Sequence, residues 1–179
     1  MIVVVGMLTL MMTWTPVVAA DGIEVRSDLV YRVVDGQELA LDVYLPSGGG
    51  SHRGAVLVIH GGGWWSGDKA DANRKFMSQQ LAQQGFVAVA VNYRLVPKDV
   101  YPAAIEDLEA AVAWLRQPAQ VSAFGIDPNR IGALGASSGA HLAGLLGSIG
   151  KGPLTQGSRV AAVVSFSGPM SCTGDLASA

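Results

Sequence analysis

Half of the 179 residues are hydrophobic and only 15% are charged, which fits one globular domain with a buried core and excludes a disordered chain. The formal net charge is −2 and Lys and Arg form no cluster, so composition argues against nucleic-acid binding. His, Cys and carboxylate residues show no metal-ligand spacing. We therefore expect neither a metal nor a cofactor.

The first twenty residues are predicted to be an export signal. Residues 1–20 carry no charged side chain and are mostly apolar, and they end in Val18-Ala19-Ala20. We expect cleavage after Ala20 and a secreted or periplasmic mature domain of residues 21–179. An uncleaved membrane anchor is the alternative, because the apolar run approaches the length of a membrane span. The single cysteine, Cys172, can form no disulfide within the chain.

Strand and helix patterns alternate after the leader. Residues 25–34 and 38–45 read as a hairpin turning through Asp35-Gly36, and a Gly/Ser-rich loop follows at 46–51. Further strands are predicted at 55–59, 86–91, 130–134 and 160–166, with helices at about 71–84, 102–116 and 138–149. This alternation predicts an α/β fold, with a mostly parallel sheet covered by helices on both faces.

The helix predicted over 102–116 illustrates the packing. Ile105, Leu108, Val112 and Leu115 recur on one face, which we expect to lie on the sheet. Its carboxylates invite comparison with the acid pair of a glycosidase. We interpret them as a solvated face near the positive end of the helix dipole. These carboxylates are Glu106, Asp107 and Glu109.

A serine motif joins the predicted strand 130–134 to the helix that follows. Gly135-Ala136-Ser137-Ser138-Gly139 fits G-x-S-x-G, a strained turn whose small flanking residues let a serine hydroxyl project above a sheet. Ser137 is the predicted nucleophile of an acyl transfer. The backbone N–H of Ser138 is a predicted donor to the oxyanion.

A glycine-rich loop follows the predicted strand 55–59. It reads His60-Gly61-Gly62-Gly63-Trp64, and such loops place backbone N–H groups around a developing negative charge. We expect Gly62 and Gly63 to donate to the oxyanion, because glycine lets the backbone approach the substrate. The two tryptophans that follow Gly63, Trp64 and Trp65, are expected either to line the substrate cleft or to anchor the loop by packing.

Five ordered segments carry a family resemblance. They are HGGGWWSGDK (60–69), VNYRL (91–95), YPAAIEDLEAAVAWLR (101–116), DPNRIGALGASSGAHLAGLLG (127–147) and VAAVVSFSGP (160–169). They resemble the α/β-hydrolase superfamily, and within it the secreted esterases akin to bacterial feruloyl and acetylxylan esterases. The resemblance implies an α/β-hydrolase fold, a serine carboxylesterase activity and a bracing role for His60.

The same resemblance implies that the catalytic acid and histidine follow the serine on later loops. The histidines of this chain are His52, His60 and His141. His141 lies four residues after Ser137, so its side chain is expected along the helix flank rather than at the cleft. Asp175 comes one strand too early for the usual acid. We therefore interpret the chain as the first two-thirds of a hydrolase domain, without its last strands and helices and inactive alone.

Several functional readings stay open. The substrate is expected to be a small-molecule ester or an acyl group on a plant polysaccharide, with no stable membrane insertion after cleavage. An amidase or exopeptidase of the same superfamily is the nearest rival among enzymes. A non-catalytic binding domain is the rival outside them, because one fold hosts many functions.

Overall fold

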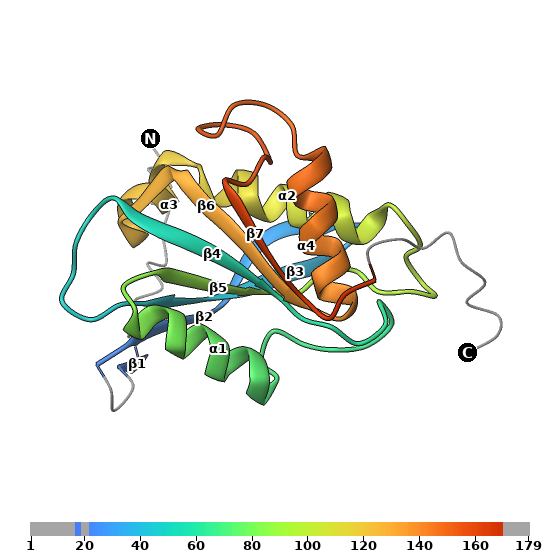
Figure 1. The fold of residues 1–179 in the computed structure, drawn as a ribbon, viewed down its shortest axis with the longest axis horizontal. Coiled ribbons are helices and arrows are strands. Elements are labelled where there is room, and N and C mark those ends of the chain that lie inside the picture. The colour runs from blue at the N-terminus through green and yellow to red at the C-terminus, as the bar shows by residue number, and fades with distance from the viewer. Residues whose placement is uncertain (1–16, 19–21, 170–179) are drawn as a thin grey trace, which may run out of the picture.

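The structure is a computed structural model that describes residues 17–18 and 22–169. Its sheet has seven strands in the order β1-β2-β3-β5-β4-β6-β7 (Figure 1). The predicted leader lies outside the described residues except for β1 (Val17–Val18), which pairs antiparallel with β2. Cys172 and Asp175 also lie outside them. Among the described residues, no helix has the length and apolar character needed to cross a bilayer.

The predicted hairpin is confirmed. β2 (Glu24–Val34) and β3 (Gln37–Leu45) pair antiparallel, with Val34 opposite Gln37. Asp35 and Gly36 turn between them with φ of 48° and 78°. Positive φ at both central residues defines the tight hairpin turn that an Asp-Gly pair favours.

The predicted parallel sheet is also confirmed. β5 (Val87–Val91) pairs antiparallel with β3 and parallel with β4 (Arg53–Ile59). β6 (Ile126–Ala136) and β7 (Ala162–Phe166) extend the parallel part beyond β4. Because β4 and β6 run parallel and adjacent, the glycine-rich loop and the serine motif leave the sheet at the same edge.

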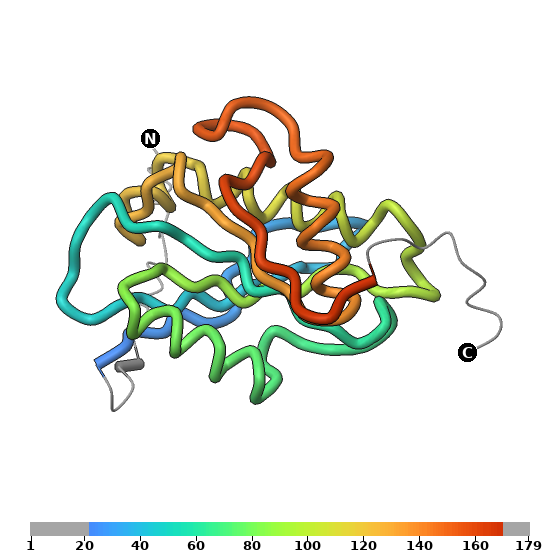
Figure 2. Tube along the Cα trace, in the orientation of Figure 1, coloured from blue at the N-terminus to red at the C-terminus, as the bar shows by residue number. Residues whose placement is uncertain are grey.

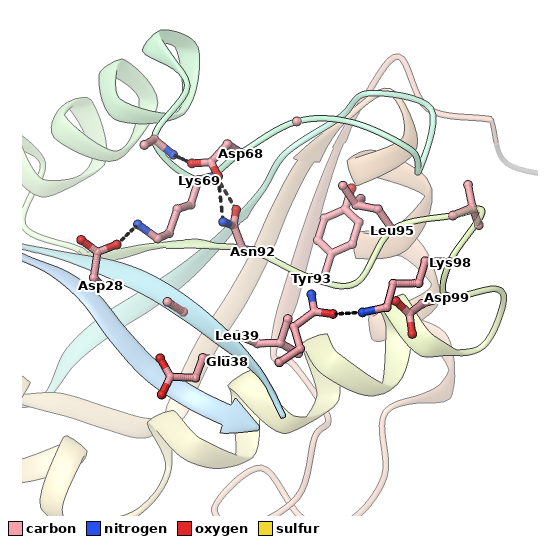
Figure 3. Close-up of a pocket in the computed structure, with 15 residues that line it drawn as sticks. Asp28, Glu38, Leu39, Asp68, Lys69, Asn92, Tyr93, Leu95, Lys98 and Asp99 are labelled. Carbon is pink, nitrogen blue, oxygen red and sulfur yellow. Dashed lines mark hydrogen bonds and ion pairs between the residues drawn. The ribbon is translucent and has the colours of Figure 1, made fainter. Parts of the chain in front are cut away.

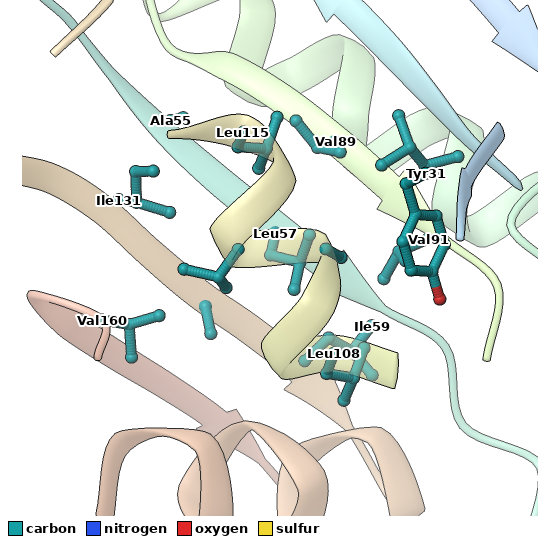
Figure 4. Packing of buried hydrophobic residues seen from close by; sticks show 14 of the residues in the cluster. Tyr31, Ala55, Leu57, Ile59, Val89, Val91, Leu108, Leu115, Ile131 and Val160 are labelled. Atoms are coloured by element: carbon teal, nitrogen blue, oxygen red, sulfur yellow. The ribbon is translucent and has the colours of Figure 1, made fainter. Parts of the chain in front are cut away.

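Helices cover both faces of the sheet, as predicted. α1 (Ala72–Gln83) covers one face, and α2 (Ala103–Leu115) and α4 (Ser138–Ile149) cover the other (Figures 1 and 2). The larger hydrophobic core lies under α2 and α4, and residues such as Leu57 and Leu108 belong to it (Figure 4). A smaller core lies under α1.

A short helix, α3 (Pro118–Phe124), follows α2 and was not predicted. Pro118 stands at its first position, and Gly125 ends it in the left-handed conformation with φ of 64°. Proline at the start and glycine just past the end are ordinary helix boundaries. Both signals were therefore present in the sequence.

The interpretation of the acidic face of α2 was wrong for Asp107. This carboxylate is completely buried and accepts hydrogen bonds from Arg32 Nη1 at 2.6 Å and Arg94 Nε at 2.9 Å. Glu106 remains half exposed beside Arg94, and Glu109 accepts a hydrogen bond from Ser158. Two arginines from other elements make burial of the Asp107 charge possible, because buried charges require partners.

Candidate active site

Ser137 occupies a strained turn between β6 and α4. Its φ and ψ are 55° and −125°, a combination that costs a non-glycine residue roughly 1–3 kcal/mol. Its backbone N–H donates to the carbonyl of Phe166 on β7 at 2.9 Å, and the residue is exposed. The turn therefore presents Ser137 at the carboxyl edge of the sheet, the geometry that G-x-S-x-G predicts.

The two flanking glycines are required by close backbone contacts. A Cβ on Gly135 would lie 2.1 Å from the Gly139 carbonyl oxygen. A Cβ on Gly139 would lie 2.5 Å from the carbonyl oxygens of both Ile59 and His60. The start of α4 thus packs directly against the end of β4, with no room for side chains between them.

The glycine-rich loop lies against the serine turn. A Cβ on Gly61 would lie 2.8 Å from the Ala136 carbonyl oxygen and 3.3 Å from Ser137 Cβ. Gly62 and Gly63 adopt φ of 116° and 64°, values that glycine accepts without strain. The carbonyl of Gly62 accepts a hydrogen bond from Ser66 N–H at 3.1 Å, which closes the loop into a turn.

A groove of about 540 Å³ is lined by part of the predicted site. Ser137, Gly61 and Gly62 line it together with polar residues near the start of α1. Gly63 is the next residue of the loop but does not line the groove, and Ser138 is 2% exposed. The structure therefore brings the predicted nucleophile and one predicted oxyanion glycine to the same groove.

His60 is held at the start of the glycine-rich loop. Its ring is buried, lies 4.3 Å from the Tyr93 ring in a stack, and has Nδ1 2.8 Å from the Gly61 carbonyl oxygen. Tyr93 Oη donates to the His60 carbonyl at 2.8 Å. Burial lowers the pKa of His60 and raises that of Tyr93, so a neutral imidazole and a protonated phenol are favoured.

The other two histidines lie elsewhere. His52 is exposed and directly precedes β4, at the opposite end of that strand from the groove. His141 is half-buried on α4, with its ring edge-on to Trp64 at 5.5 Å. Burial lowers the pKa of His141. Of the two tryptophans, Trp64 packs against the core and Trp65 is 71% exposed.

Ion pairs hold Lys69 in the segment that joins the glycine-rich loop to α1, and Figure 3 shows the pair with Asp28. Lys69 Nζ lies 2.7 Å from both Asp28 Oδ1 and Asp42 Oδ1. The side chains of Lys69 and Asp42 are 7% and 4% exposed, whereas that of Asp28 is 79% exposed. Although burial alone would lower the pKa of Lys69, the two carboxylates raise it. The charged lysine thus ties the loop to the hairpin.

Asn92, directly after β5, completes this attachment. Its side-chain oxygen accepts a hydrogen bond from Lys69 N–H at 2.6 Å, and its side-chain nitrogen donates to Asp68 at 2.9 Å (Figure 3). Three consecutive residues therefore hold different parts of the site. Asn92 bonds Lys69, Tyr93 bonds the His60 carbonyl, and Arg94 bonds Asp107 on α2. Nothing in the neighbouring sequence predicts these contacts, although VNYRL is one of the segments that carry the family resemblance.

Comparison with known proteins gives consistent matches. A family model described as BD-FAE matches residues 41–176. Arylacetamide deacetylase from Bos taurus is 37% identical over 94 residues, covering 52% of this chain and 24% of that protein.

Two solved structures have similar folds. One, described as Thermogutta terrifontis esterase 2 phosphorylated by paraoxon, has a TM-score of 0.68 at 30% identity, covering 80% of this chain and 57% of that one. The other, described as a truncated form of carbohydrate esterase from gut microbiota, has a TM-score of 0.70 at 28% identity, covering 84% and 59%. The chain thus spans little more than half of these structures and about a quarter of the bovine relative.

Proposed function

The chain belongs to the BD-FAE family of α/β-hydrolases, and we propose that the natural protein is a serine esterase with Ser137 as its nucleophile. One observation carries the proposal. An exposed serine with positive φ stands at a strand-to-helix turn, and a glycine loop lies against its Cβ. A binding domain has no need for this strained arrangement.

In the proposed reaction, Ser137 Oγ bonds to the ester carbonyl carbon while a general base takes its proton. The carbonyl electrons move to the oxygen and return as the bond to the alcohol breaks, and the base gives the proton to the leaving alcohol. Water then repeats the sequence on the acyl-enzyme and releases the acid. The described residues are assigned the nucleophile and the oxyanion donors, and no base is assigned among them.

The oxyanion is proposed to accept hydrogen bonds from the N–H groups of Gly62, Gly63 and Ser138. Loss of one such donor typically costs about 3 kcal/mol of transition-state stabilisation. The buried His60 and the Lys69 ion pair support the proposal, because they fix both ends of the loop that carries the glycines. Preorganised donors stabilise charge without reorganisation during the reaction.

A narrower substrate is proposed from the relatives. Acyl groups on plant polysaccharides are the proposed natural esters, supported by the likeness to a structure described as a carbohydrate esterase.

Export after cleavage at Ala20 is proposed together with this substrate, because polysaccharides lie outside the cell that secretes the enzyme. N-terminal sequencing of protein from an export-competent bacterium is expected to begin at Asp21. An intact Met1 on cytoplasmic protein would contradict export.

The nucleophile is tested without relying on turnover. The natural full-length protein is treated with paraoxon and its peptides are analysed by mass spectrometry, with nitrophenyl acetate hydrolysis measured in parallel. We expect a diethylphosphoryl group on Ser137 and its absence in Ser137→Ala, which also loses hydrolysis. The matched control is Ser148→Ala on the same helix, whose exposed hydroxyl donates to the Gly144 carbonyl. Full labelling or activity in Ser137→Ala would remove the assignment.

The loop is tested by Gly62→Ala. The added Cβ would meet the Ser66 carbonyl oxygen at 2.2 Å in a backbone with φ of 116°, so the loop must shift. We expect kcat to fall more than KM rises, because oxyanion contacts strengthen in the transition state. An effect confined to KM would exclude Gly62 from the oxyanion role.

A further inference from the structure

A polar pocket lies between the β2–β3 hairpin and two segments of chain, 67–70 before α1 and 92–99 after β5 (Figure 3). Its volume is about 630 Å³, within the range of small-molecule sites. Neither Ser137 nor residues 61–63 of the glycine-rich loop line it, so the proposed reaction leaves this pocket unused.

The polar groups of the walls are held in place and offer both donors and acceptors. Asp68 accepts hydrogen bonds from Ala70 N–H at 2.7 Å and from Asn92 Nδ2 at 2.9 Å. Lys98 Nζ donates to Gln37 Oε1 at 2.7 Å, an exposed bond that links the segment after β5 to the hairpin. A carboxylate oxygen accepts more than one hydrogen bond, and an ammonium group has three donors. These groups can therefore pair with the hydroxyls of a ligand while they keep their own partners.

The pocket also has an apolar floor. Leu39 and Tyr93 are each 3% exposed, and the half-buried Leu95 belongs to the same lining. Figure 3 shows Tyr93 and Leu95 between Asn92 at one end of the view and Lys98 at the other. The C–H groups of a ligand gain from leaving water against such a surface.

This combination of groups selects among classes of ligand. Within the described part of the chain, no three His, Cys, Asp or Glu side chains gather in a way that could hold a metal ion. An alkyl chain would bury the charged walls without partners. A sugar ring carries hydroxyl groups around its edge and C–H groups on its faces. Carbohydrate is therefore the class that matches polar walls around an apolar floor.

Gly67 connects this pocket to the groove that contains Ser137. It is exposed and lines both cavities. A Cβ on Gly67 would overlap His60 Nδ1, and its φ is 108°, so glycine is required where the backbone passes the His60 ring. The two cavities thus meet at a residue that places no side chain between them.

We propose that the polar pocket binds unesterified sugar units of the same polysaccharide chain whose ester Ser137 attacks. This inference rests on the proposed function, because it assumes a polysaccharide substrate. Binding energy from units remote from the ester can raise kcat/KM on a polymer. A small ester such as nitrophenyl acetate does not extend to the pocket and gains nothing from it.

The pocket is tested first by binding, without turnover. The natural full-length protein carrying Ser137→Ala is titrated with xylohexaose, cellohexaose and mannohexaose in a calorimeter. We expect at least one hexasaccharide to bind, and the addition of Lys98→Met or Gln37→Leu to raise its Kd at least fivefold. The matched controls are Lys151→Met and Gln156→Leu, at exposed positions outside the pocket and the groove, with Kd unchanged. No binding of any hexasaccharide, or equal Kd in pocket and control variants, would overturn the proposal.

The link to the reaction is tested with the acetyl ester of the hexasaccharide that binds most tightly. We expect Lys98→Met to lower the ratio of kcat/KM for this ester to that for nitrophenyl acetate at least threefold, with nitrophenyl acetate unchanged within twofold. Lys151→Met should leave the ratio unchanged. A higher Kd for the hexasaccharide with an unchanged ratio would show that the bound sugar lies off the path of the esterified chain, which contradicts the proposal.

Two measurements separate the possible failures. Urea unfolding of Lys98→Met should match that of the parent protein, because the bond to Gln37 is exposed, so weaker sugar binding cannot come from unfolding. A natural protein that hydrolyses no ester and takes no paraoxon label removes the proposed function, whereas the hexasaccharide titration needs neither activity nor label. Ester hydrolysis with pocket variants that behave like the controls removes this inference alone.

Discussion

The rings of His60 and Tyr93 stack 4.3 Å apart, and the Tyr93 hydroxyl donates to the His60 carbonyl oxygen at 2.8 Å. His60 directly follows β4 and Tyr93 lies just after β5, the neighbouring parallel strand. Parallel pairing therefore brings the two residues together at the carboxyl edge of the sheet. The stack fixes the ring and the hydrogen bond fixes the backbone from which the glycine-rich loop begins.

Tyr93→Phe is expected to keep the stack and lose the hydrogen bond. The buried His60 carbonyl would lose this donor, which typically costs about 1–3 kcal/mol in the free energy of unfolding. Because the loop starts at that carbonyl, kcat for nitrophenyl acetate is expected to fall more than KM rises. Urea unfolding and steady-state kinetics on the natural protein measure both effects. The control Tyr101→Phe, at a residue 73% exposed, should leave the free energy of unfolding unchanged.

Lys69→Met is expected to be strongly destabilising. The change leaves Asp42, 4% exposed, without its cation, and breaking a buried pair typically costs about 3–5 kcal/mol. Asp28→Asn should matter far less, because that partner is 79% exposed and surface pairs contribute about 0–1 kcal/mol. Lys69→Arg should recover part of the loss, and Lys98→Met, at an exposed bond to Gln37, serves as the control. Equal losses for Lys69→Met and Lys98→Met in urea unfolding would contradict the buried pair.

Local patterns predicted the elements of the fold in their correct order, apart from β1 and α3. The Asp35-Gly36 turn, the apolar runs and the spacing of Ile105 and Leu108 are encoded by neighbouring residues. The strand predicted at 130–134 extends to Ile126–Ala136, because pairing with a neighbour lengthens a strand beyond its apolar centre. The same local signals placed the serine turn and the glycine loop each directly after a predicted strand.

Charge pairs between residues far apart in the chain leave no signal in the neighbouring sequence. Asp107 is buried because Arg32 and Arg94 reach it, and Arg32 lies 75 residues away in the chain. Lys69 meets Asp42 across 27 residues. From helical periodicity alone, a carboxylate on a helix is expected to be solvated, since nothing in the surrounding residues identifies a distant partner. The supports of the candidate site, unlike its two motifs, therefore required the structure.

Two glycines of α4 provide a matched test of how closely α4 packs against the sheet. A Cβ on Gly139 would meet the carbonyls of Ile59 and His60 at 2.5 Å, whereas a Cβ on Gly144 would meet nothing within 4 Å. Gly139→Ala should destabilise the protein by about 1–3 kcal/mol or more and lower kcat. Gly144→Ala should stabilise it by about 0.5–1 kcal/mol through helix propensity. Thermal and urea unfolding of the two variants compare them directly, and similar stabilities would contradict the close approach.

Acid should weaken the fold through the buried His60 and the half-buried His141 before the carboxylates titrate. Burial lowers the pKa of both His60 and His141, so the unfolded chain binds protons more readily, at about pH 6.5. Their contribution to stability is then fully present above about pH 6.5 and is lost as pH falls through the lower folded-state values. Urea unfolding of the natural protein between pH 8 and pH 5.5 should show a falling free energy of unfolding. His141→Gln should reduce the slope of the free energy against pH. A free energy that stays constant or rises toward pH 5.5 would show that folding keeps neither the His60 ring nor the His141 ring neutral.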